Sequence, residues 1–353
     1  MKFYNLQAMR GVAACMVFLI HLLSTKHGLG ADWFLFKWWW VGPAGVDLFF
    51  VISGFIVCYT AAKAGREDVA PITAATRFGI KRLFRVYPVY WIVLAVSFAL
   101  APYVQTADPG MAAERVWRLV TLATTNNNRV VLAWTLCYEL FFYLVLALII
   151  LIRPKQVYEL VLGWIALQIG LTIWASGGGL QMFNYVPLSP LILEFGAGCI
   201  LAFMVDRGVK AYGWQSLVAG VALFCVAVWA HSQNGNWAPW WRSLYFTIPC
   251  ALIVYGAIAI EISSGVTLPA WLQKVGDSSY SIYIWHQLVL AILLKLTEIS
   301  GLFDMLPGLL ILFIWGVIAL AFGFLSYQVI EKPSQNWIHH VMKRPERREL
   351  SHI

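Results

Sequence analysis

A series of about ten long apolar segments constrains this chain more than any other feature of its sequence. The segments are Met9–Leu23, Ala44–Ala62, Val86–Tyr103, Val130–Ile152, Val157–Ala175, Pro190–Val205, Trp214–Ala230, Leu244–Ile262, Ser281–Leu296 and Pro307–Ile330. A helix needs about 20 apolar residues to cross the hydrocarbon core of a bilayer. The sequence therefore predicts an all-α, polytopic integral membrane bundle of about ten transmembrane helices. Pro190–Val205 is the short segment, and for it a partly re-entrant path stays open.

The composition excludes the soluble classes of protein. Hydrophobic residues make up 61% of the 353 residues and charged residues only 12%. A soluble domain has about 45–50% apolar and about 25% charged residues. This chain has too little polar surface to cover a water-soluble body, so a soluble enzyme, a disordered chain and a nucleic-acid-binding module are all excluded.

The basic residues predict an orientation. The chain carries 25 Lys and Arg against 17 Asp and Glu. With a cytoplasmic N terminus and ten spans, 18 of the 25 basic residues fall on the cytoplasmic side and 7 on the other. Cytoplasmic loops of membrane proteins carry such an excess. We therefore expect both termini in the cytoplasm, with a transmembrane domain over residues 1–338 and a charged cytoplasmic tail over residues 339–353.

The first span holds two ionisable residues, Arg10 and His21. Eleven residues turn an α-helix by a near-whole number of turns, so both side chains lie on one face, about 16 Å apart along the axis. Ionisable groups are costly inside a membrane and mark functional sites by default. The structural alternative is an arginine that reaches the interface and a histidine bonded to a neighbouring helix.

Arg82 and Arg85 precede the third predicted span at i,i+3 spacing and share a face if this stretch is helical. They lie on the same predicted side as Arg10. Guanidinium groups bind phosphate through paired hydrogen bonds, so three clustered arginines suit a phosphorylated nucleotide. The alternative is plain anchoring at the membrane surface or contact with anionic lipid.

Acidic residues intrude on three other spans. Glu139 lies at a depth similar to that of His21, and a carboxylate beside a histidine orients the ring and raises its basicity. A structural ion pair is the alternative for Glu139. Asp47 and Glu194 lie at the starts of spans near the outer face. Close helix packing is the alternative explanation for the segment around Asp47, and a solvated helix end explains Glu194 equally well.

Aromatic and amide side chains gather on the predicted outer side, among them Trp134 and Asn127. Indole rings stack on sugars and amides bond to them, although an aromatic belt at the membrane surface explains many of the tryptophans. The six cysteines all fall in predicted spans and form no CxxC pair, so they indicate neither a disulfide framework nor a metal site.

Six motifs in chain order resemble the acyltransferase-3 family of bacterial membrane proteins. They are the arginine–ten residues–histidine pattern of Arg10 and His21, the segment Gly45–Phe55, the pair Arg82 and Arg85 before Tyr87-Pro88, the segment Trp134–Tyr143 with Thr135 at a usual serine position, the segment Gly276–His286, and Glu331-Lys332-Pro333. The sequence of these segments is most similar to the branch of the family that O-acetylates exopolysaccharides.

The resemblance implies transfer of an acetyl group from cytoplasmic acetyl-CoA to a carbohydrate hydroxyl at the outer face. It makes His21 the general base or a transient acetyl carrier, with Glu139 orienting His21 or balancing the arginines. Arg10, Arg82 and Arg85 would hold the acyl-CoA phosphates, and Tyr280 and His286 would belong to the donor site. We assign Asp47, Trp134, Asn127 and Glu194 to the acceptor side.

The same resemblance implies a location in the bacterial inner membrane and no requirement for a metal. The expected partners are the bilayer, an exopolysaccharide or lipid-linked sugar, and polysaccharide assembly machinery, but no nucleic acid. The oligomeric state stays open. Two other classes remain: a sugar exporter without acyl-transfer chemistry, and a structural subunit of an assembly complex.

Overall fold

The computed structural model describes residues 3–26, 28–30, 41–103, 113–127, 129–177, 185–234 and 239–342, and all regular structure in these ranges is helical. The elements are α1 Tyr4–Ser24, α3 Val41–Gly65, α4 Pro71–Leu100, α5 Ala113–Val120, η1 Val131–Ala133, α6 Trp134–Ile152, η2 Pro154–Gln156, α7 Val157–Gly177, η4 Val186–Leu188, α8 Ile192–Asp206, α9 Gly213–Asn234, α10 Pro239–Ser264, α11 Ala270–Asp277, α12 Ser279–Ile299, α13 Leu302–Met305, α14 Gly308–Ser326, η5 Tyr327–Glu331 and α15 Lys332–Val341. Most of the predicted tail, from residue 343 onward, lies outside the described residues.

In the described part of the chain, nine helical segments are long and apolar enough to cross a membrane. The predicted all-α, multi-pass bundle is thereby confirmed. The tenth predicted span, Pro190–Val205, forms α8, whose 15 residues reach only about 22 Å against a hydrocarbon core of about 30 Å. α8 packs closely on α3, since a Cβ on Gly198 would lie 2.1 Å from the carbonyl oxygen of Val51.

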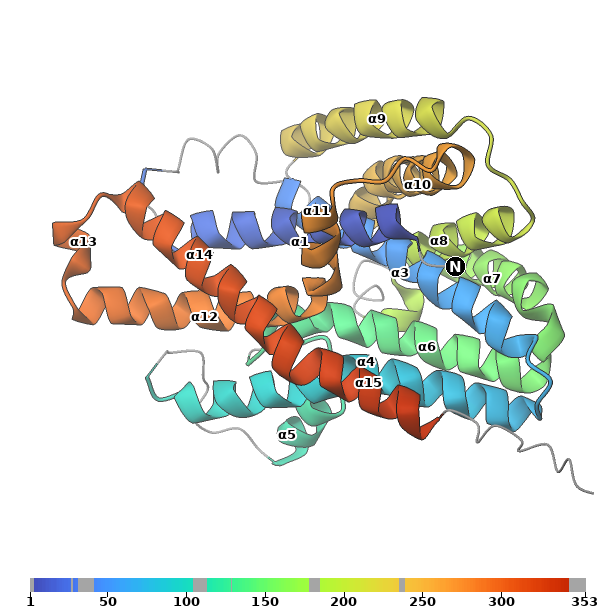
Figure 1. The fold of residues 1–353 in the computed structure, drawn as a ribbon, viewed down its shortest axis with the longest axis horizontal. Helices are drawn as coiled ribbons and strands as arrows, with labels where there is room; N and C mark the ends of the chain where they lie inside the picture. The colour runs from blue at the N-terminus through green and yellow to red at the C-terminus, as the bar shows by residue number, and fades with distance from the viewer. Residues whose placement is uncertain are drawn as a thin grey trace, which may run out of the picture.

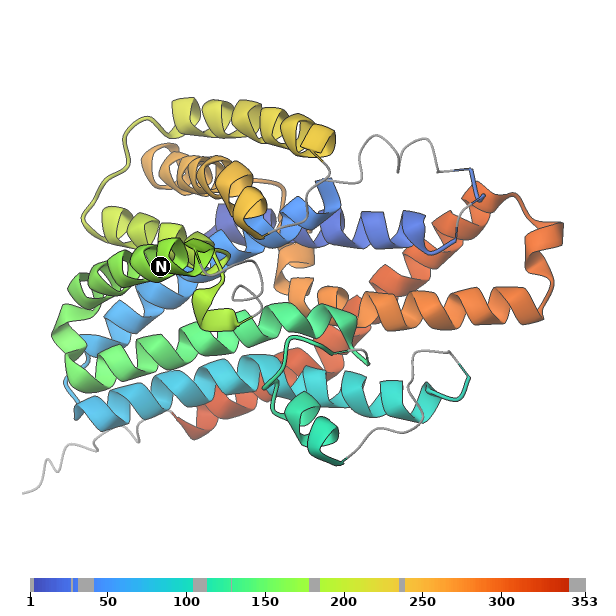
Figure 2. The ribbon, with the colours of Figure 1, turned by 180° about the vertical axis from the view of Figure 1, so that it is seen from behind.

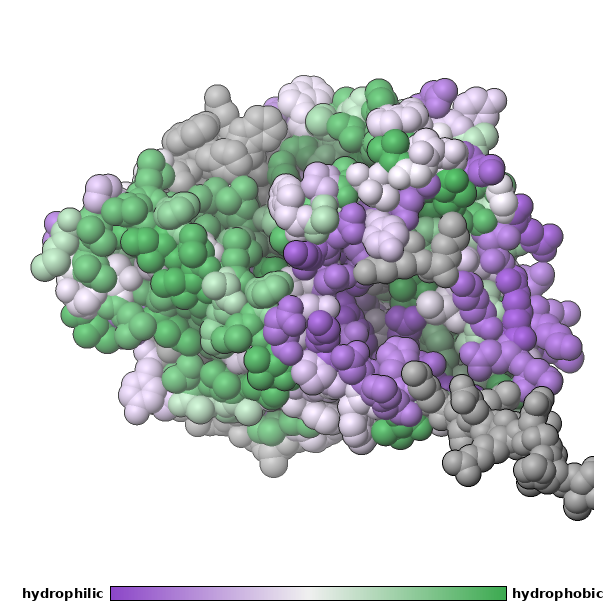
Figure 3. All heavy atoms as spheres, viewed as in Figure 1, coloured by the Kyte–Doolittle hydropathy of each residue, from purple (hydrophilic) through white to green (hydrophobic). Residues whose placement is uncertain are grey.

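The helices α1, α4, α6 and α12 run along the long axis of the molecule, and α14 with α15 crosses them obliquely (Figures 1 and 2). We call the end at which α3 ends and α4 begins the basic end, because Lys63, Arg66, Arg77 and Lys81 lie there. Figure 3 shows hydrophilic residues gathered toward this end and hydrophobic residues over α12 and α14 at the other. The surface thus changes character along the bundle axis.

Helix α4 begins at Pro71, well before the predicted start at Val86, and runs for 30 residues. The basic stretch that precedes Val86 is therefore helical and continuous with the span. The conditional prediction that Arg82 and Arg85 share a face is confirmed, because both side chains line the same cavity.

Helix α11 lies across α1 (Figure 1). A Cβ on Gly276 would lie 1.7 Å from the carbonyl oxygen of Gln7, so the crossing requires glycine at this position. α12 follows directly, and its first residue, Ser279, shares a cavity with Arg10. Because Arg10 is about 9 Å along α1 from Tyr4, α12 begins inside the bundle and not at its surface.

Candidate active site

Three of the cavities in the described part of the chain contain residues predicted for the site. The basic cavity, of about 320 Å³, is lined by Lys63, Arg77, Lys81, Arg82 and Arg85 among others. The central cavity, of about 70 Å³, is lined by residues that include Arg10, Ser53, Arg85, Glu139, Tyr143 and Tyr280. The histidine cavity, of about 290 Å³, is lined by residues that include His21, Ser24, Thr25, Arg129 and Gln287.

The cavities follow one another along the bundle axis. On α4, Arg85 lines both the basic and the central cavity, and Val93, two turns further, lines the histidine cavity. On α1, Arg10 lines the central cavity and His21 the histidine cavity, about 16 Å apart along the helix. The predicted alignment of Arg10 and His21 thus joins two neighbouring cavities on one line from the basic end.

Two arginines that line the basic cavity have N–H groups without a hydrogen-bond partner in the part of the chain that the structure describes. Arg82 donates to the hydroxyl of Thr60, but its Nε is buried without a hydrogen-bond partner among the described residues. Nη2 of Arg85 is likewise buried without a hydrogen-bond partner among the described residues. An unsatisfied buried donor is costly, and guanidinium N–H groups match phosphate oxygens in geometry. The cavity therefore has the donor set that a phosphorylated ligand needs.

Glu331, which lies far from Arg85 in the sequence, holds the Arg85 side chain in place. The carboxylate is buried, pairs with Arg85, and accepts hydrogen bonds from Ser281 Oγ at 2.6 Å and Gln335 Nε2 at 3.2 Å. It ends η5, a π-helical turn, and such turns are frequent at functional sites. Sequence reasoning placed Glu331 in the Glu331-Lys332-Pro333 motif but assigned it no role; its position directly after a long apolar run was the available clue.

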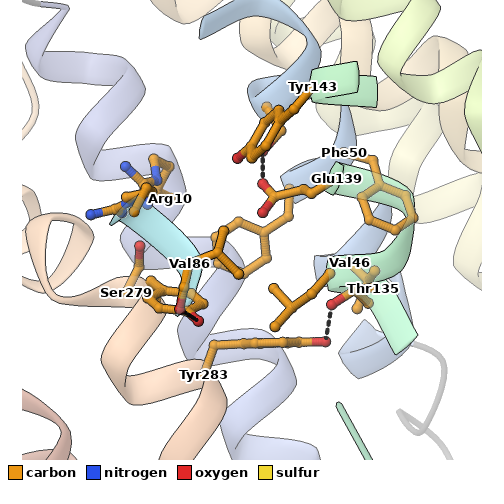
Figure 4. A pocket seen from close by; sticks show the side chains of 14 residues that line it. Arg10, Val46, Phe50, Val86, Thr135, Glu139, Tyr143, Ser279 and Tyr283 are labelled. Atoms are coloured by element: carbon orange, nitrogen blue, oxygen red, sulfur yellow. Dashed lines mark hydrogen bonds between the residues drawn. The ribbon is translucent and has the colours of Figure 1, made fainter. Parts of the chain in front are cut away.

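The carboxylate of Glu139 lies in the central cavity, where Ser53 Oγ donates to it at 2.6 Å and the Tyr143 hydroxyl also bonds to it (Figure 4). Arg10 and Arg85 line the same cavity. The expectation that Glu139 lies beside His21 is wrong, because His21 lines the next cavity. The geometry agrees instead with the other alternative, a carboxylate that balances the arginines.

Arg10 is held by neutral groups. Its Nη1 donates to Gln7 Oε1 at 3.2 Å, and Gln7 Nε2 donates to Asp277 Oδ1 at 3.1 Å. Among the described residues Arg10 forms no ion pair, and it lines the central cavity (Figure 4). Asp277, at the end of α11, thereby orients an arginine across the α1–α11 crossing.

Two tyrosines of α12 line the central cavity. Tyr280 donates to the carbonyl oxygen of Val86 at 2.6 Å, and so lies with Arg85, as expected for a donor-site residue. The Tyr283 hydroxyl lies 3.1 Å from Thr135 Oγ1 (Figure 4) and 3.3 Å from the carbonyl oxygen of Leu132. Because Leu132 lines the histidine cavity, Tyr283 marks the boundary between the two cavities.

His21 contacts His286. Nε2 of His286 lies 3.2 Å from Nδ1 of His21, and the ring centroids are 5.1 Å apart. The expectation that His286 lies with the donor-site residues, nearer the basic end, is wrong. Span counting placed α12 at the membrane surface, whereas the α11 crossing starts it deep in the bundle and carries His286 to the level of His21.

Both polar and apolar side chains line the histidine cavity. Ser24, Thr25 and Gln287 supply hydroxyl and amide groups near His21, and Val93 and Leu288 supply apolar surface. A sugar has the same two characters, with hydroxyls at its edge and C–H groups on its faces. The cavity therefore has room and partners for one hydroxylated ring next to the His21 imidazole.

A second buried charged cluster lies between α3, α8 and α10. Nε of Arg242 donates to Asp47 at 2.8 and 3.0 Å, and its Nη2 donates to the carbonyl oxygen of Pro43 at 2.8 Å. Ser243 Oγ donates to Glu194 at 3.1 Å. Asp47 and Glu194 are both fully buried, which excludes a solvated end for Glu194.

Neither carboxylate of this cluster lines one of the three cavities. Their assignment to the acceptor side stays a prediction without geometric support. Sequence reasoning counted Arg242 only as an outer-side charge; the two acidic residues at span starts were the signal for a buried partner.

Asn127 is occupied by the chain itself. Its Nδ2 donates to the Tyr90 hydroxyl at 3.0 Å, and its Oδ1 accepts from the backbone N–H groups of Arg129 and Val130 at 3.1 and 2.8 Å. Trp134 begins α6 and packs edge-on against Phe50. Asn127 thus holds the loop that borders the histidine cavity, whereas Trp134 packs within the bundle.

No group of three potential metal ligands occurs among the residues that the structure describes. The six cysteines are free thiols, four of them buried, one partly buried and Cys225 exposed.

The apolar helices and the aligned polar cavities define a polytopic membrane protein with an internal site. Residues 3–328 match the family described as "Acyltransferase domain", so the chain belongs to that family. It is thus a multi-pass membrane acyltransferase, and the family resemblance carried by the six motifs is confirmed.

Two relatives span nearly the whole chain. The chain is 28% identical over 301 residues to the exopolysaccharide production protein ExoZ of Rhizobium meliloti (strain 1021), covering 83% of this chain and 89% of the relative. It is 26% identical over 369 residues to nodulation protein 10 of Rhizobium leguminosarum bv. viciae, covering 94% and 92%. No solved structure matches the chain.

Proposed function

We propose that this protein is an O-acyltransferase of the bacterial inner membrane. It takes an acetyl group from acetyl-CoA at the basic, cytoplasmic end and transfers it to a hydroxyl of an exopolysaccharide or its lipid-linked precursor at the opposite face. One observation carries the proposal: three successive levels of the bundle hold, in order, arginines with unused donors, a central cavity lined by Arg10 and Glu139, and a histidine beside a cavity of about 290 Å³.

The donor's phosphates fit the basic cavity. Arg82 Nε and Arg85 Nη2 are buried donors without partners among the described residues, and Lys63, Arg77 and Lys81 add positive charge around them. A nucleotide carrying several phosphates satisfies these donors and neutralises the cluster. The chain's own carboxylates, Glu331 and Glu139, keep the arginines oriented when the donor is absent.

The thioester arm extends from the phosphates through the central cavity toward His21. Arg10, Tyr280 and Tyr283 line this passage, and the axial distance from Arg10 to His21 is about 16 Å. The cavity is narrow, which suits an extended chain and excludes a bulky headgroup. The acyl group thus reaches the histidine cavity while the nucleotide stays at the basic end.

His21 supplies the acid–base chemistry. Its imidazole takes the proton of the acceptor hydroxyl as the oxygen attacks the thioester carbonyl, so that a C–O bond forms. When the C–S bond breaks, the imidazolium returns the proton to the leaving thiolate. In the two-step variant, the imidazole nitrogen attacks the thioester first and carries the acetyl group before the hydroxyl accepts it.

The acceptor class rests on the relatives and on the cavity. ExoZ is named for exopolysaccharide production, and the histidine cavity offers Ser24, Thr25 and Gln287 as hydrogen-bonding groups beside an apolar wall. This mixture fits a sugar ring with one hydroxyl directed at His21.

The test compares His21→Ala with the wild type in inverted membrane vesicles supplied with labelled acetyl-CoA, in a strain that makes the native polysaccharide. We expect the variant to lower incorporation of label at least about 100-fold, because general acid–base groups contribute 10²–10⁴-fold. Normal incorporation at wild-type protein levels would refute the proposal. Arg66→Ala, at the exposed rim outside the cavities, serves as the control and should incorporate label normally.

A further inference from the structure

Two histidines lie in contact, and each is bonded to a carbonyl oxygen of its own helix. Nδ1 of His21 lies 2.8 Å from the carbonyl oxygen of Val17, and Nδ1 of His286 lies 3.1 Å from the carbonyl oxygen of Ile282. The rings meet through Nδ1 of His21 and Nε2 of His286, at 3.2 Å. His286 is buried at 1% exposure, whereas His21 is partly exposed and lines the cavity.

The carbonyl contacts assign the protons. A carbonyl oxygen only accepts hydrogen bonds, so the ring nitrogen that bonds to it carries a hydrogen. His286 therefore bears its hydrogen on Nδ1. The rings of Phe18 and Tyr283 pack edge-on against it, in surroundings where an isolated imidazolium is costly. In neutral His286, Nε2 is then a lone-pair acceptor.

The same reasoning fixes His21. Its Nδ1–H lies between two acceptors, the carbonyl oxygen of Val17 and Nε2 of His286, and donates to both as a three-centre hydrogen bond. The opposite tautomer would set the Nδ1 lone pair of His21 against two other lone pairs, at 2.8 and 3.2 Å. That arrangement is repulsive at both contacts. Nε2 of His21 is consequently the nitrogen with the free lone pair.

We propose that His286 is a positioning residue for His21, a role that rests on the proposed function. By accepting from Nδ1–H, it holds the His21 ring in the orientation and tautomer that present Nε2 as the base or nucleophile. When Nε2 takes the hydroxyl proton, the positive charge spreads to Nδ1–H. The bond to His286 then becomes charge-assisted and strengthens.

Two variants of His286 separate this role from packing. His286→Gln removes the ring but places a side-chain amide oxygen near the former position of Nε2, so an acceptor for His21 remains. His286→Phe keeps an aromatic ring and removes the acceptor. Both are compared in labelled acetyl-CoA assays on inverted vesicles, after matching protein levels and thermal stability.

We expect His286→Phe to lower kcat about 10- to 100-fold, the effect of losing one hydrogen bond to a group that becomes charged. The KM for acetyl-CoA should not change, because His286 lines neither the basic nor the central cavity. His286→Gln should recover most of kcat. Equal kcat values for the two variants, or a wild-type kcat in His286→Phe, would overturn the role of His286.

A second readout does not depend on activity. Nitrogen-15 NMR of histidine-labelled protein, with His21 assigned by comparison with His21→Ala, reports which ring nitrogen carries the hydrogen. We expect hydrogen on Nδ1 and a lone pair on Nε2; the reverse tautomer would overturn the inference. Failure of the proposed function shows differently, as normal acetyl transfer in His21→Ala, and leaves the tautomer measurement valid.

Discussion

Two charged clusters lie in the same apolar bundle, one partly buried and one fully buried, and they differ in how their donors are satisfied. The open cluster consists of Arg10, Arg82 and Arg85, which line the basic and central cavities. The closed cluster consists of Asp47, Glu194 and Arg242, which line none of the three cavities. In the open cluster, N–H groups of Arg82 and Arg85 lack partners among the described residues. In the closed cluster, Arg242 donates to a carboxylate and a carbonyl group, and the one unpaired buried atom is an acceptor, Oε2 of Glu194, among the described residues.

The difference shows how buried charge can be interpreted. The Arg242–Asp47 pair, whose groups satisfy each other, gives no reason to expect a ligand, and removing one partner leaves an uncompensated charge. A buried cation with unused donors next to a cavity is costly until something binds there. The same residue type thus indicates structure in one place and binding in the other.

The largest expected effect breaks the closed cluster. Arg242→Met leaves Asp47 and Glu194 buried without their cation, and we expect a loss of about 3–5 kcal/mol in the free energy of unfolding. Denaturation of the purified protein in detergent measures it. Asp47→Leu combined with Arg242→Met should recover most of the loss, because an apolar pair of similar volume replaces the ion pair. A stable Arg242→Met protein without acyl transfer would instead place this cluster in the active site.

A smaller effect, on binding and not on folding, is expected at the open cluster. Arg10→Ala removes a guanidinium that forms no ion pair among the described residues. We expect acetyl-CoA affinity to fall about 10- to 100-fold with the thermal midpoint nearly unchanged. Isothermal titration of the purified protein with acetyl-CoA measures the affinity, with Arg66→Ala as the matched exposed control. A large loss of stability without a change in acetyl-CoA affinity would instead give Arg10 a structural role, like that of Arg242.

The smallest expected effect concerns a neutral polar side chain, that of Asn127, and tests whether a group satisfied by the protein itself has only a structural role. Among the described residues, the Asn127 side chain bonds within its own loop and to Tyr90. Asn127→Ala should cost about 1–2 kcal/mol of stability, since it leaves buried groups unpaired. Label incorporation per folded molecule should stay within about twofold of wild type. A large drop in incorporation with normal stability would return Asn127 to the acceptor site.

The local sequence was enough to predict helices and which residues to suspect. Apolar segments of sufficient length predict spans because backbone groups in lipid must bond within their own helix. The one segment that differs, Pro190–Val205, was recognisable as short. Arg10 and His21 were placed on one face by helix periodicity alone, and the structure puts both on the line of cavities.

Contacts between residues on different helices could not be predicted from the positions of the spans in the sequence. Glu139 was paired with His21 by counting depth from the two membrane faces, which assumes that every span starts at the surface. Helix α12 does not, because the glycine contact between Gly276 and Gln7 lets α11 cross α1 and start α12 beside Arg10. Depth estimates along α12 were therefore shifted, and His286 was assigned to the wrong level.

The sequence by itself determined the membrane class, the family and the set of ionisable residues that lipid makes costly. These depend on composition and on periodicity within one helix, which are local properties. Tertiary structure alone decided which residues meet: Arg85 with Glu331, Arg242 with Asp47, and His21 with His286. Such contacts depend on how helices cross, and the crossings are set by close packing between segments far apart in the chain.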